Sequence, residues 1–205
     1  MNIVVLAGGL STERDVSLNT GTMVSKALRS KGHNVIMLDV FMGYHEEEED
    51  ITDIFNHTEE ASADVAQIPG EAPDIAQVKA MRKDQSACFF GPNVIKICQA
   101  ADIVFMALHG ENGENGKIQA AFDLFGIQYT GSRYLGSALA MDKGISKKMF
   151  EAAGIPTPHG IAMSKTQRHT PFSETGLTLP CVVKPCCGGS SIGVTIVRTA
   201  DEYEA

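Results

Sequence analysis

The first forty residues constrain the fold more than any other part of the chain. A short apolar run at residues 3–7 (IVVLA) ends at a pair of glycines, and a second run occupies residues 34–40 (NVIMLDV). Apolar runs without polar alternation are typical of strands that are buried on both faces of a parallel sheet. The segment between them has apolar residues at helical spacing, with Ser17 as the expected N-cap and Gly32 near the expected C-terminus. This order predicts a right-handed βαβ unit.

The same kind of pattern continues further along the chain. Residues 102–108 (DIVFMAL) predict a third buried strand, and residues 118–125 have the apolar spacing of a helix that Gly126 closes. A shorter apolar run, residues 127–130, predicts a fourth strand, and the sheet pattern ends after it. We therefore expect residues 1–132 to form an α/β domain with a doubly wound, largely parallel sheet.

Residues 133–205 predict a second, smaller domain. Asp142 can cap a helix that ends at a glycine shortly before a proline. Residues 179–184 (LPCVVK) and 194–197 (VTIV) predict two strands of a hairpin on either side of a glycine-serine loop. A further short strand is predicted at residues 160–163.

Composition and charge narrow the range of functions. The net charge of -8 argues against a protein that binds a nucleic-acid backbone, which usually carries a basic face. No apolar run is long enough to span a membrane, and the first residues do not have the pattern of a signal peptide. The five cysteines show no metal-binding spacing and fit a reducing compartment. We expect a cytoplasmic protein with neither a nucleic-acid nor a membrane partner.

Two segments depart from the sheet pattern. Residues 43–87 contain the acidic run 46–50 together with prolines and glycines, and they predict a surface insertion with one or two short helices. The acidic run itself is typical of a solvated face. Residues 201–205 look like the opening of a helix, so we expect the chain to be a piece of a longer protein.

One candidate phosphate site combines a lysine with a glycine-serine loop. Lys184 ends a predicted strand, and residues 188–193 (GGSSIG) follow. Backbone N–H groups of glycines and serine hydroxyls can approach an anion closely, and a lysine supplies a point charge. Lys143 lies in the first turn of a predicted helix, where a cation opposes the helix dipole unless an anion is near. The simpler interpretations are an exposed hairpin turn and an ion pair between Lys143 and Asp142.

A second candidate site lies where two predicted parallel strands end. Glu13 and Asp15 follow the first strand, and His109 follows the third. Open α/β sheets bind ligands at the carboxyl ends of their strands. A carboxylate there can hold a ligand ammonium group. Alternatively, Glu13 and Asp15 favour the helix start electrostatically, and His109 has a structural role.

Six motifs follow one another along the chain: GGLSTERDVSL (8–18), ALHGENGENGKIQ (107–119), YTGS (129–132), ALAMDK (138–143), GIPTP (154–158) and VVKPCCGGSSIGV (182–194). Taken in this order, they resemble those of the D-alanine–D-alanine ligases, which are ATP-grasp enzymes of cell-wall synthesis. The resemblance covers nearly the whole chain apart from the acidic insertion. It implies an N-terminal pre-ATP-grasp domain on the side of the first substrate, followed by the small α+β ATP-grasp subdomain on the side of the ATP phosphates.

The resemblance implies the ligation of two D-alanines for peptidoglycan synthesis. ATP phosphorylates the carboxylate of the first D-alanine, the amine of the second attacks the acyl phosphate, and phosphate leaves. It also implies ATP and Mg²⁺ (with Mn²⁺ as a substitute) as cofactors, a homodimer and a bacterial cytoplasmic location. The alternatives are a ligase that makes D-Ala–D-Ser or D-Ala–D-lactate, another ATP-grasp carboxylate–amine ligase, and a non-catalytic nucleotide or amino-acid binding module.

The resemblance also implies roles for individual residues. Glu13, as a catalytic residue, would hold the ammonium of the first D-alanine, and Val16 would contact its methyl group. His109 would lie near the same substrate, and Ser190, also catalytic, would bond near it and orient Glu13. The ATP phosphates would be bound by Lys143, Lys184, Gly188, Gly189, Ser190, Ser191 and Gly193.

Two departures from the family pattern bear on this hypothesis. Cys186 and Cys187 stand where members often carry polar or charged residues, so we expect a site that is sensitive to oxidation or alkylation. The magnesium ligands and the transition-state arginine of the family would lie beyond Ala205. We therefore expect the 205-residue chain alone to fold as two linked domains, to bind ATP weakly and to be inactive as a ligase.

Overall fold

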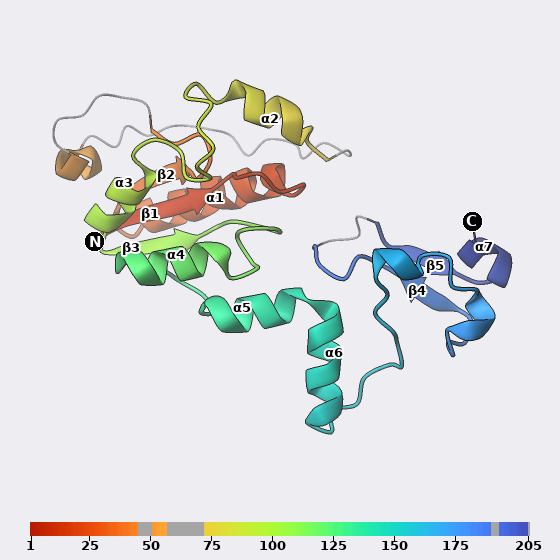
Figure 1. Ribbon diagram of the computed structural model, residues 1–205. Coiled ribbons are helices and arrows are strands. Elements are labelled where there is room, and N and C mark those ends of the chain that lie inside the picture. Colours follow the sequence, from red (N-terminus) through yellow and green to blue (C-terminus); the bar gives the residue numbers. More distant parts are fainter. Residues whose placement is uncertain (45–50, 57–71, 190–192, 205) are drawn as a thin grey trace. The chain divides into compact units, whose positions relative to one another are not determined.

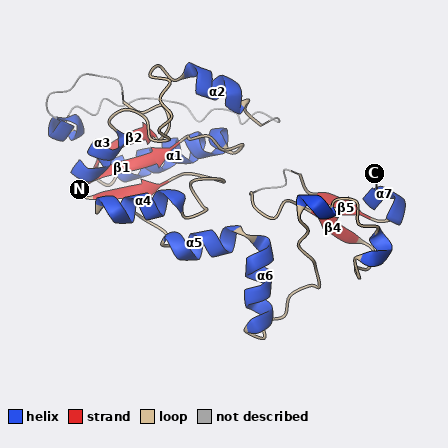
Figure 2. Ribbon diagram, in the orientation of Figure 1, coloured by secondary structure: helices blue, strands red, loops and turns tan. Residues whose placement is uncertain are grey.

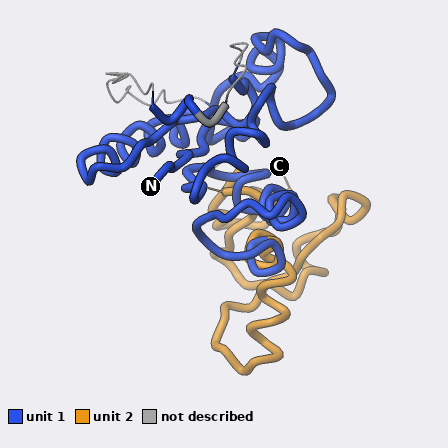
Figure 3. The backbone as a smooth tube through the Cα atoms, turned by 90° about the vertical axis from the view of Figure 1, so that its left-hand side faces the viewer, with its two compact units in different colours: residues 1–137 blue, residues 138–205 orange. Residues whose placement is uncertain are grey.

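The chain is divided into two compact units, residues 1–137 and 138–205, in a computed structural model that describes residues 1–44, 51–56, 72–189 and 193–204 (Figure 3). The division falls within helix α5 (Tyr134–Met141), a few residues after the predicted boundary at residue 132. The roles predicted for the two parts, a first-substrate side and an ATP-phosphate side, stay predictions.

Unit 1 is built on a three-stranded parallel sheet with the order β2-β1-β3 (Figures 1 and 2). The strands are β1 (Asn2–Ala7), β2 (Asn34–Asp39) and β3 (Ile103–Met106). Ile3 of β1 pairs with Val35 on one side and with Ile103 on the other. The three predicted strands are confirmed, and because they are parallel their carboxyl ends meet at one edge.

Helices cover both faces of this sheet, as predicted for a doubly wound fold. Alternate side chains of β1 are buried on opposite faces. Val4 and Leu6 pack in one cluster with residues of α3 (Val94–Ala100) and α4 (Lys117–Phe125). Ile3 and the other odd-numbered residues pack in a second cluster with α1 (Arg14–Arg29). A strand that is buried on both faces explains why its sequence shows no polar alternation.

Ser17 is not the N-cap of α1, which is a correction to the sequence prediction. The helix begins at Arg14, and Ser17 lies fully buried within it. Its hydroxyl accepts a hydrogen bond from Gly8 N at 2.9 Å and donates one to Ala107 O at 2.8 Å. The buried hydroxyl therefore satisfies two backbone groups at the ends of β1 and β3, which local spacing alone cannot reveal.

The predicted fourth strand is reduced to a single bridge. Tyr129 pairs with Val104 as an isolated parallel bridge, and Thr130 N donates to Val104 O at 3.0 Å. Helix α4 is confirmed, with Gly126 closing it at a φ of 69°. The short bridge extends the sheet beside β3 without adding a full ladder.

The predicted surface insertion contributes to the core, contrary to expectation. It contains η1 (Ile51–Phe55) and α2 (Ile75–Met81), and the acidic run 46–50 lies outside the described residues. Ile54 and Phe55 are buried in the cluster that includes α3. The insertion therefore covers apolar surface that the sheet and α3 would otherwise expose to water.

Unit 2 contains short helices and a two-stranded antiparallel hairpin. Helix α6 (Lys143–Ala152) is followed by η2 (Lys165–Gln167), η3 (Phe172–Glu174), β4 (Cys181–Val183), β5 (Thr195–Val197) and α7 (Ala200–Glu204). The helix and the hairpin agree with prediction. The strand predicted at residues 160–163 is wrong, because this segment forms no ladder with any described residue. Within the described part of the chain, no helix is long and apolar enough to cross a membrane.

Candidate functional site

Two loops meet at the carboxyl edge of the sheet in unit 1. One follows β1 and the other follows β3. Ser11 Oγ donates to His109 O at 2.7 Å and accepts from Glu13 N at 3.1 Å, so one hydroxyl joins the two loops. Together with the buried hydroxyl of Ser17, it fixes the loop that carries Glu13 against the loop that carries His109.

Glu13 extends from the start of α1 towards the turn at Gly110. It occupies the N-cap position, yet its side chain makes no capping bond in the described structure. A Cβ added at Gly110 would lie 2.7 Å from Glu13 Oε2, so the carboxylate stands directly over that turn. Gly110 has a φ of 72°, a conformation that glycine adopts without strain. This placement matches a carboxylate available to a ligand better than one that caps the helix.

His109 and Val16 are half-buried near the same edge. The His109 Nε2 atom lies 3.0 Å from Thr20 Oγ1, so the imidazole is oriented by a hydroxyl on α1. Val16 lies in the first turn of α1, three residues after Glu13. The structure therefore joins the loops of Glu13 and His109 at one edge of the sheet, and Val16 lies in the helix that follows Glu13. The roles of these three residues stay predictions.

Sequence reasoning missed a buried ion pair that supports this region. Arg14 and Asp39 form a salt bridge, with 11% and 15% of their side chains exposed. Arg14 Nη1 also donates to Gly9 O at 2.7 Å, and Asp39 Oδ1 accepts from Phe41 N at 2.9 Å. The pair ties the loop after β1 to the end of β2. The sequence contained one signal for this pair, because Asp39 stands at the end of a predicted buried strand, at the same sheet edge as Glu13.

The two predicted phosphate-binding lysines lie in unit 2. Lys143 is the first residue of α6, and its Nζ donates to Gly188 O at 2.8 Å. Its backbone N donates to Cys186 O at 3.0 Å, so the loop after β4 is held against the start of α6. Lys184 follows β4 and is exposed. Among the described residues, Lys143 contacts loop carbonyls and forms no ion pair with Asp142.

The remaining loop residues are described only in part. Gly188 and Gly189 lie between Cys187 and the first undescribed position, and Gly193 has a φ of 71°. Ser190 and Ser191 lie outside the described residues, so their predicted roles stay predictions.

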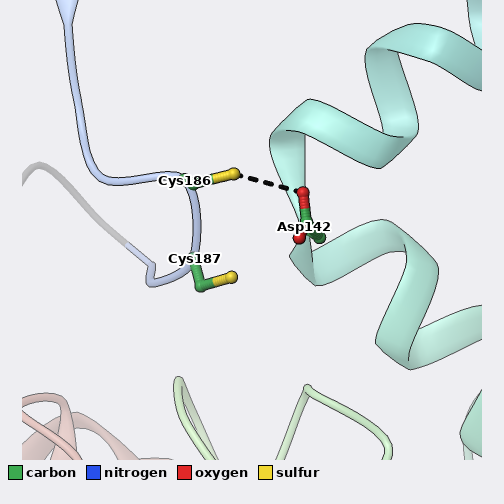
Figure 4. A group of neighbouring side chains, drawn as sticks. All are labelled: Asp142, Cys186 and Cys187. Atoms are coloured by element: carbon green, nitrogen blue, oxygen red, sulfur yellow. Dashed lines mark hydrogen bonds between the residues drawn. The ribbon is translucent and has the colours of Figure 1, made fainter. Parts of the chain in front are cut away.

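Asp142 links the start of α6 to the cysteine pair (Figure 4). Its Oδ1 accepts from Ile145 N at 2.9 Å and from Cys186 Sγ at 3.1 Å. The hydrogen bond from Ile145 and then that from Cys186 lower the pKa of Asp142. The same contact raises the pKa of Cys186, because losing its proton would place a thiolate beside a carboxylate.

This cluster does not suit magnesium. In the described residues, the one group of three potential metal ligands is Asp142, Cys186 and Cys187. Magnesium prefers oxygen ligands in octahedral geometry, and two of these three ligands are sulfur. These three residues therefore do not form a magnesium site.

Two family models match the chain. The model described as D-ala D-ala ligase N-terminus matches residues 2–132, and the one described as D-ala D-ala ligase C-terminus matches residues 149–205. Together these matches cover most of both units.

Individual proteins agree with the family models. The D-alanine–D-alanine ligase of Lacticaseibacillus casei is 42% identical over 208 residues, covering 100% of this chain and 56% of that protein. The ligase of Pediococcus pentosaceus is 44% identical, covering 100% of this chain and 57% of that protein. The chain thus spans about half the length of the curated relatives it matches.

Solved structures give the same result. The crystal structure of a D-alanine–D-alanine ligase from Bacillus anthracis matches with a TM-score of 0.64 and 30% identity, over 98% of this chain and 51% of that one. The same ligase complexed with ATP matches with a TM-score of 0.63 and 28% identity, over 98% of this chain and 50% of that one.

Proposed function

Because the chain belongs to the D-alanine–D-alanine ligase family, we propose that it supplies the first-substrate site and part of the ATP site of an enzyme that makes D-alanyl-D-alanine. The observation that carries the proposal is the position of the Glu13 carboxylate over the His109–Gly110 turn at the carboxyl edge of a parallel sheet. Ligands of open α/β folds bind at this edge, and the carboxylate has the charge to bind an ammonium group there.

The proposed reaction has two steps. A carboxylate oxygen of the first D-alanine attacks the γ-phosphorus of ATP, and the bond to the β,γ-bridging oxygen breaks, which releases ADP. The amine nitrogen of the second D-alanine then attacks the acyl carbon. Its proton goes to solvent, and inorganic phosphate leaves with the bonding electrons. The residues act mainly by positioning the reactants and neutralising charge.

In unit 1, Glu13 binds the ammonium of the first D-alanine. A charge-assisted hydrogen bond of this kind contributes about 1.5–3 kcal/mol to binding. His109, oriented by Thr20, lies beside the same substrate, and Val16 faces its methyl group. The ion pair of Arg14 with Asp39 keeps the loop of Glu13 in place.

In unit 2, Lys143 and Lys184 neutralise the ATP phosphates. Lys143 Nζ now donates to the Gly188 carbonyl, and a phosphate oxygen is a stronger acceptor for the same ammonium. Gly188, Gly189, Ser190, Ser191 and Gly193 would add backbone and hydroxyl donors to those phosphates. Magnesium would neutralise phosphate charge, and its ligands in the proposal lie outside this chain.

The broader biological assignments rest on the family alone. They are a role in peptidoglycan synthesis, a bacterial cytoplasmic location and a homodimer. Sedimentation of the protein across a range of concentrations tests the dimer, and a mass that stays that of one chain would exclude it.

The test uses a chain extended to the length of the relatives. It is incubated with ATP, magnesium and D-alanine, with and without D-serine or D-lactate, while phosphate release is followed and products are weighed by mass spectrometry. We expect D-alanyl-D-alanine, and its loss in Glu13→Gln and Lys184→Ala. Glu111→Gln is the matched control, because Glu111 lies in the same loop as His109 but its side chain is 68% exposed. Absence of phosphate release with every acceptor would contradict the proposal, and a mixed product would identify a variant ligase.

A further inference from the structure

The proposed reaction gives no role to the cysteine pair beside α6. One ligand atom from each of Asp142, Cys186 and Cys187 lies within 4.8 Å of the other two (Figure 4). The carboxylate precedes α6, whereas both thiols come from the loop after β4. We propose that these three residues bind a thiophilic divalent cation such as Zn²⁺, and that the bound ion holds the loop against α6.

The spacing of the three side chains suits a zinc-sized ion. Zinc binds sulfur at about 2.3 Å and carboxylate oxygen at about 2.0–2.2 Å, so tetrahedral ligand atoms are about 3.3–3.8 Å apart. Cys186 Sγ and Asp142 Oδ1 are already 3.1 Å apart. Small rotations of the side chains therefore admit the ion, and water can occupy the fourth position because both thiols are exposed.

The backbone around the cluster holds the ligands together. Lys143 N donates to Cys186 O at 3.0 Å, and Lys143 Nζ donates to Gly188 O at 2.8 Å, on either side of Cys187. At Gly144, an added Cβ would lie 3.2 Å from Asp142 Oδ1 and 3.3 Å from Cys186 Sγ. The missing side chain at Gly144 thus leaves room for the close approach. A site whose ligands are already positioned loses less entropy on binding.

The ligand chemistry favours zinc or a similar ion over magnesium. Thiolate ligands select soft or borderline cations, and a carboxylate completes a mixed sulfur and oxygen set. On binding, the S–H bonds of the two thiols break, their protons go to solvent, and two metal–sulfur bonds form. No residue is oxidised or reduced. The two positive charges of the ion offset two of the three negative charges on its ligands.

The expected consequence rests on the proposed function. In that function Lys143 Nζ exchanges the Gly188 carbonyl for a phosphate oxygen. An ion that ties Cys186 and Cys187 to Asp142 opposes this exchange, because it fixes the loop in its contact with α6. Bound zinc should therefore weaken ATP binding by about tenfold, a typical coupling between two sites.

The first experiment measures metal binding without reference to catalysis. Co²⁺ is titrated into the full-length protein in a reductant that contains no thiol, and thiolate-to-cobalt charge-transfer absorbance is recorded. We expect one cobalt ion to bind per chain, and zinc to displace it. Cys186→Ser and Cys187→Ser should each abolish this binding. Asp142→Asn should weaken it while preserving the helix cap, because asparagine is also a good N-cap. Cys88→Ser, which removes an exposed thiol of unit 1, is the matched control and should retain the signal.

Clear results would overturn the inference. Absorbance that never appears, or that persists unchanged when both cysteines are serine, would exclude the site. The second experiment compares ATP affinity with and without zinc in the wild type and in Cys186→Ser, which corrects for zinc bound to the nucleotide itself. If zinc lowered the ATP affinity of the wild type and of Cys186→Ser equally, the inhibitory role would be excluded. A metal-free protein that binds no ATP would contradict the proposed function, while the cobalt titration would still decide the metal site.

Discussion

Replacing Gly110 by alanine separates the position of Glu13 from the stability of the fold. Gly110 has a φ of 72°, and a methyl group there would lie 2.7 Å from Glu13 Oε2. Ordinary contact begins near 3.4 Å, so the carboxylate must move by about 0.7 Å. The atom lies at the end of a flexible side chain, so rotation of Glu13 relieves the clash at little cost in folding free energy. The carboxylate is then displaced from the substrate ammonium.

The matched control is Gly32→Ala. Gly32 has a φ of 79°, and nothing lies within 4 Å of an added Cβ. Both variants place alanine in the left-handed region, which costs about 1–2 kcal/mol in unfolding free energy. Because the backbone penalty is shared, the difference between the variants reports the effect of the methyl group on its neighbours at Gly110, which are Glu13 Oε2 at 2.7 Å and, less severely, Cβ and Oγ of Ser11 at 3.3 Å.

We expect the two variants to differ in activity and to agree in stability. Urea unfolding should show similar losses for both. In the phosphate-release assay on the full-length protein, Gly110→Ala should lower kcat/KM for D-alanine by about 10- to 100-fold, as expected for a misplacement of this size. Gly32→Ala should change it less than about twofold, because the added methyl meets no neighbouring atom. Near-normal activity in Gly110→Ala, or an equal loss in Gly32→Ala, would refute the reasoning.

Three further predictions concern buried or hydrogen-bonded groups. Burial raises the pKa of Cys98 from 9.0 to about 12, so above pH 9 the unfolded chain loses this proton before the folded one. The contribution of Cys98 to the free energy of unfolding should therefore fall by about 1.4 kcal/mol between pH 8 and 10. Urea unfolding at the two pH values measures this change, which should be missing in Cys98→Ala. Asp39→Ala leaves the largely buried Arg14 unpaired and should cost about 3 kcal/mol in unfolding free energy; a loss below about 1 kcal/mol in urea would be inconsistent with a buried pair. Asp142→Asn removes the carboxylate whose hydrogen bond, and then whose charge, raises the pKa of Cys186, and should speed the alkylation of this thiol by iodoacetamide at pH 8, measured by mass spectrometry. An unchanged rate would show that the carboxylate does not control this thiol.

The last of these predictions also modifies the expected reactivity of the cysteine pair. Both thiols are exposed, which agrees with access to reagents. However, the raised pKa of Cys186 reduces the thiolate that reacts. Exposure could be anticipated from a polar loop, but the protecting carboxylate could not, because Asp142 lies 44 positions earlier in the chain.

The sequence by itself determined the elements whose signals are local. The apolar runs located β1, β2 and β3, Gly126 marked the end of α4, and Asp142 marked the start of α6. It also placed the loops of Glu13 and His109 at one edge, because parallel strands end on the same side. These signals are readable because periodicity, caps and chain direction depend on neighbouring residues alone.

Only the tertiary structure decided which distant groups meet. Ser17, predicted as a helix cap, instead forms buried hydrogen bonds at the ends of β1 and β3, and Arg14 pairs with Asp39. The tertiary structure also buries Phe55 of the insertion and brings Cys186 to Asp142. A buried polar group must find a partner, and an apolar one must find a surface to cover, but which partner or surface is available depends on packing in three dimensions.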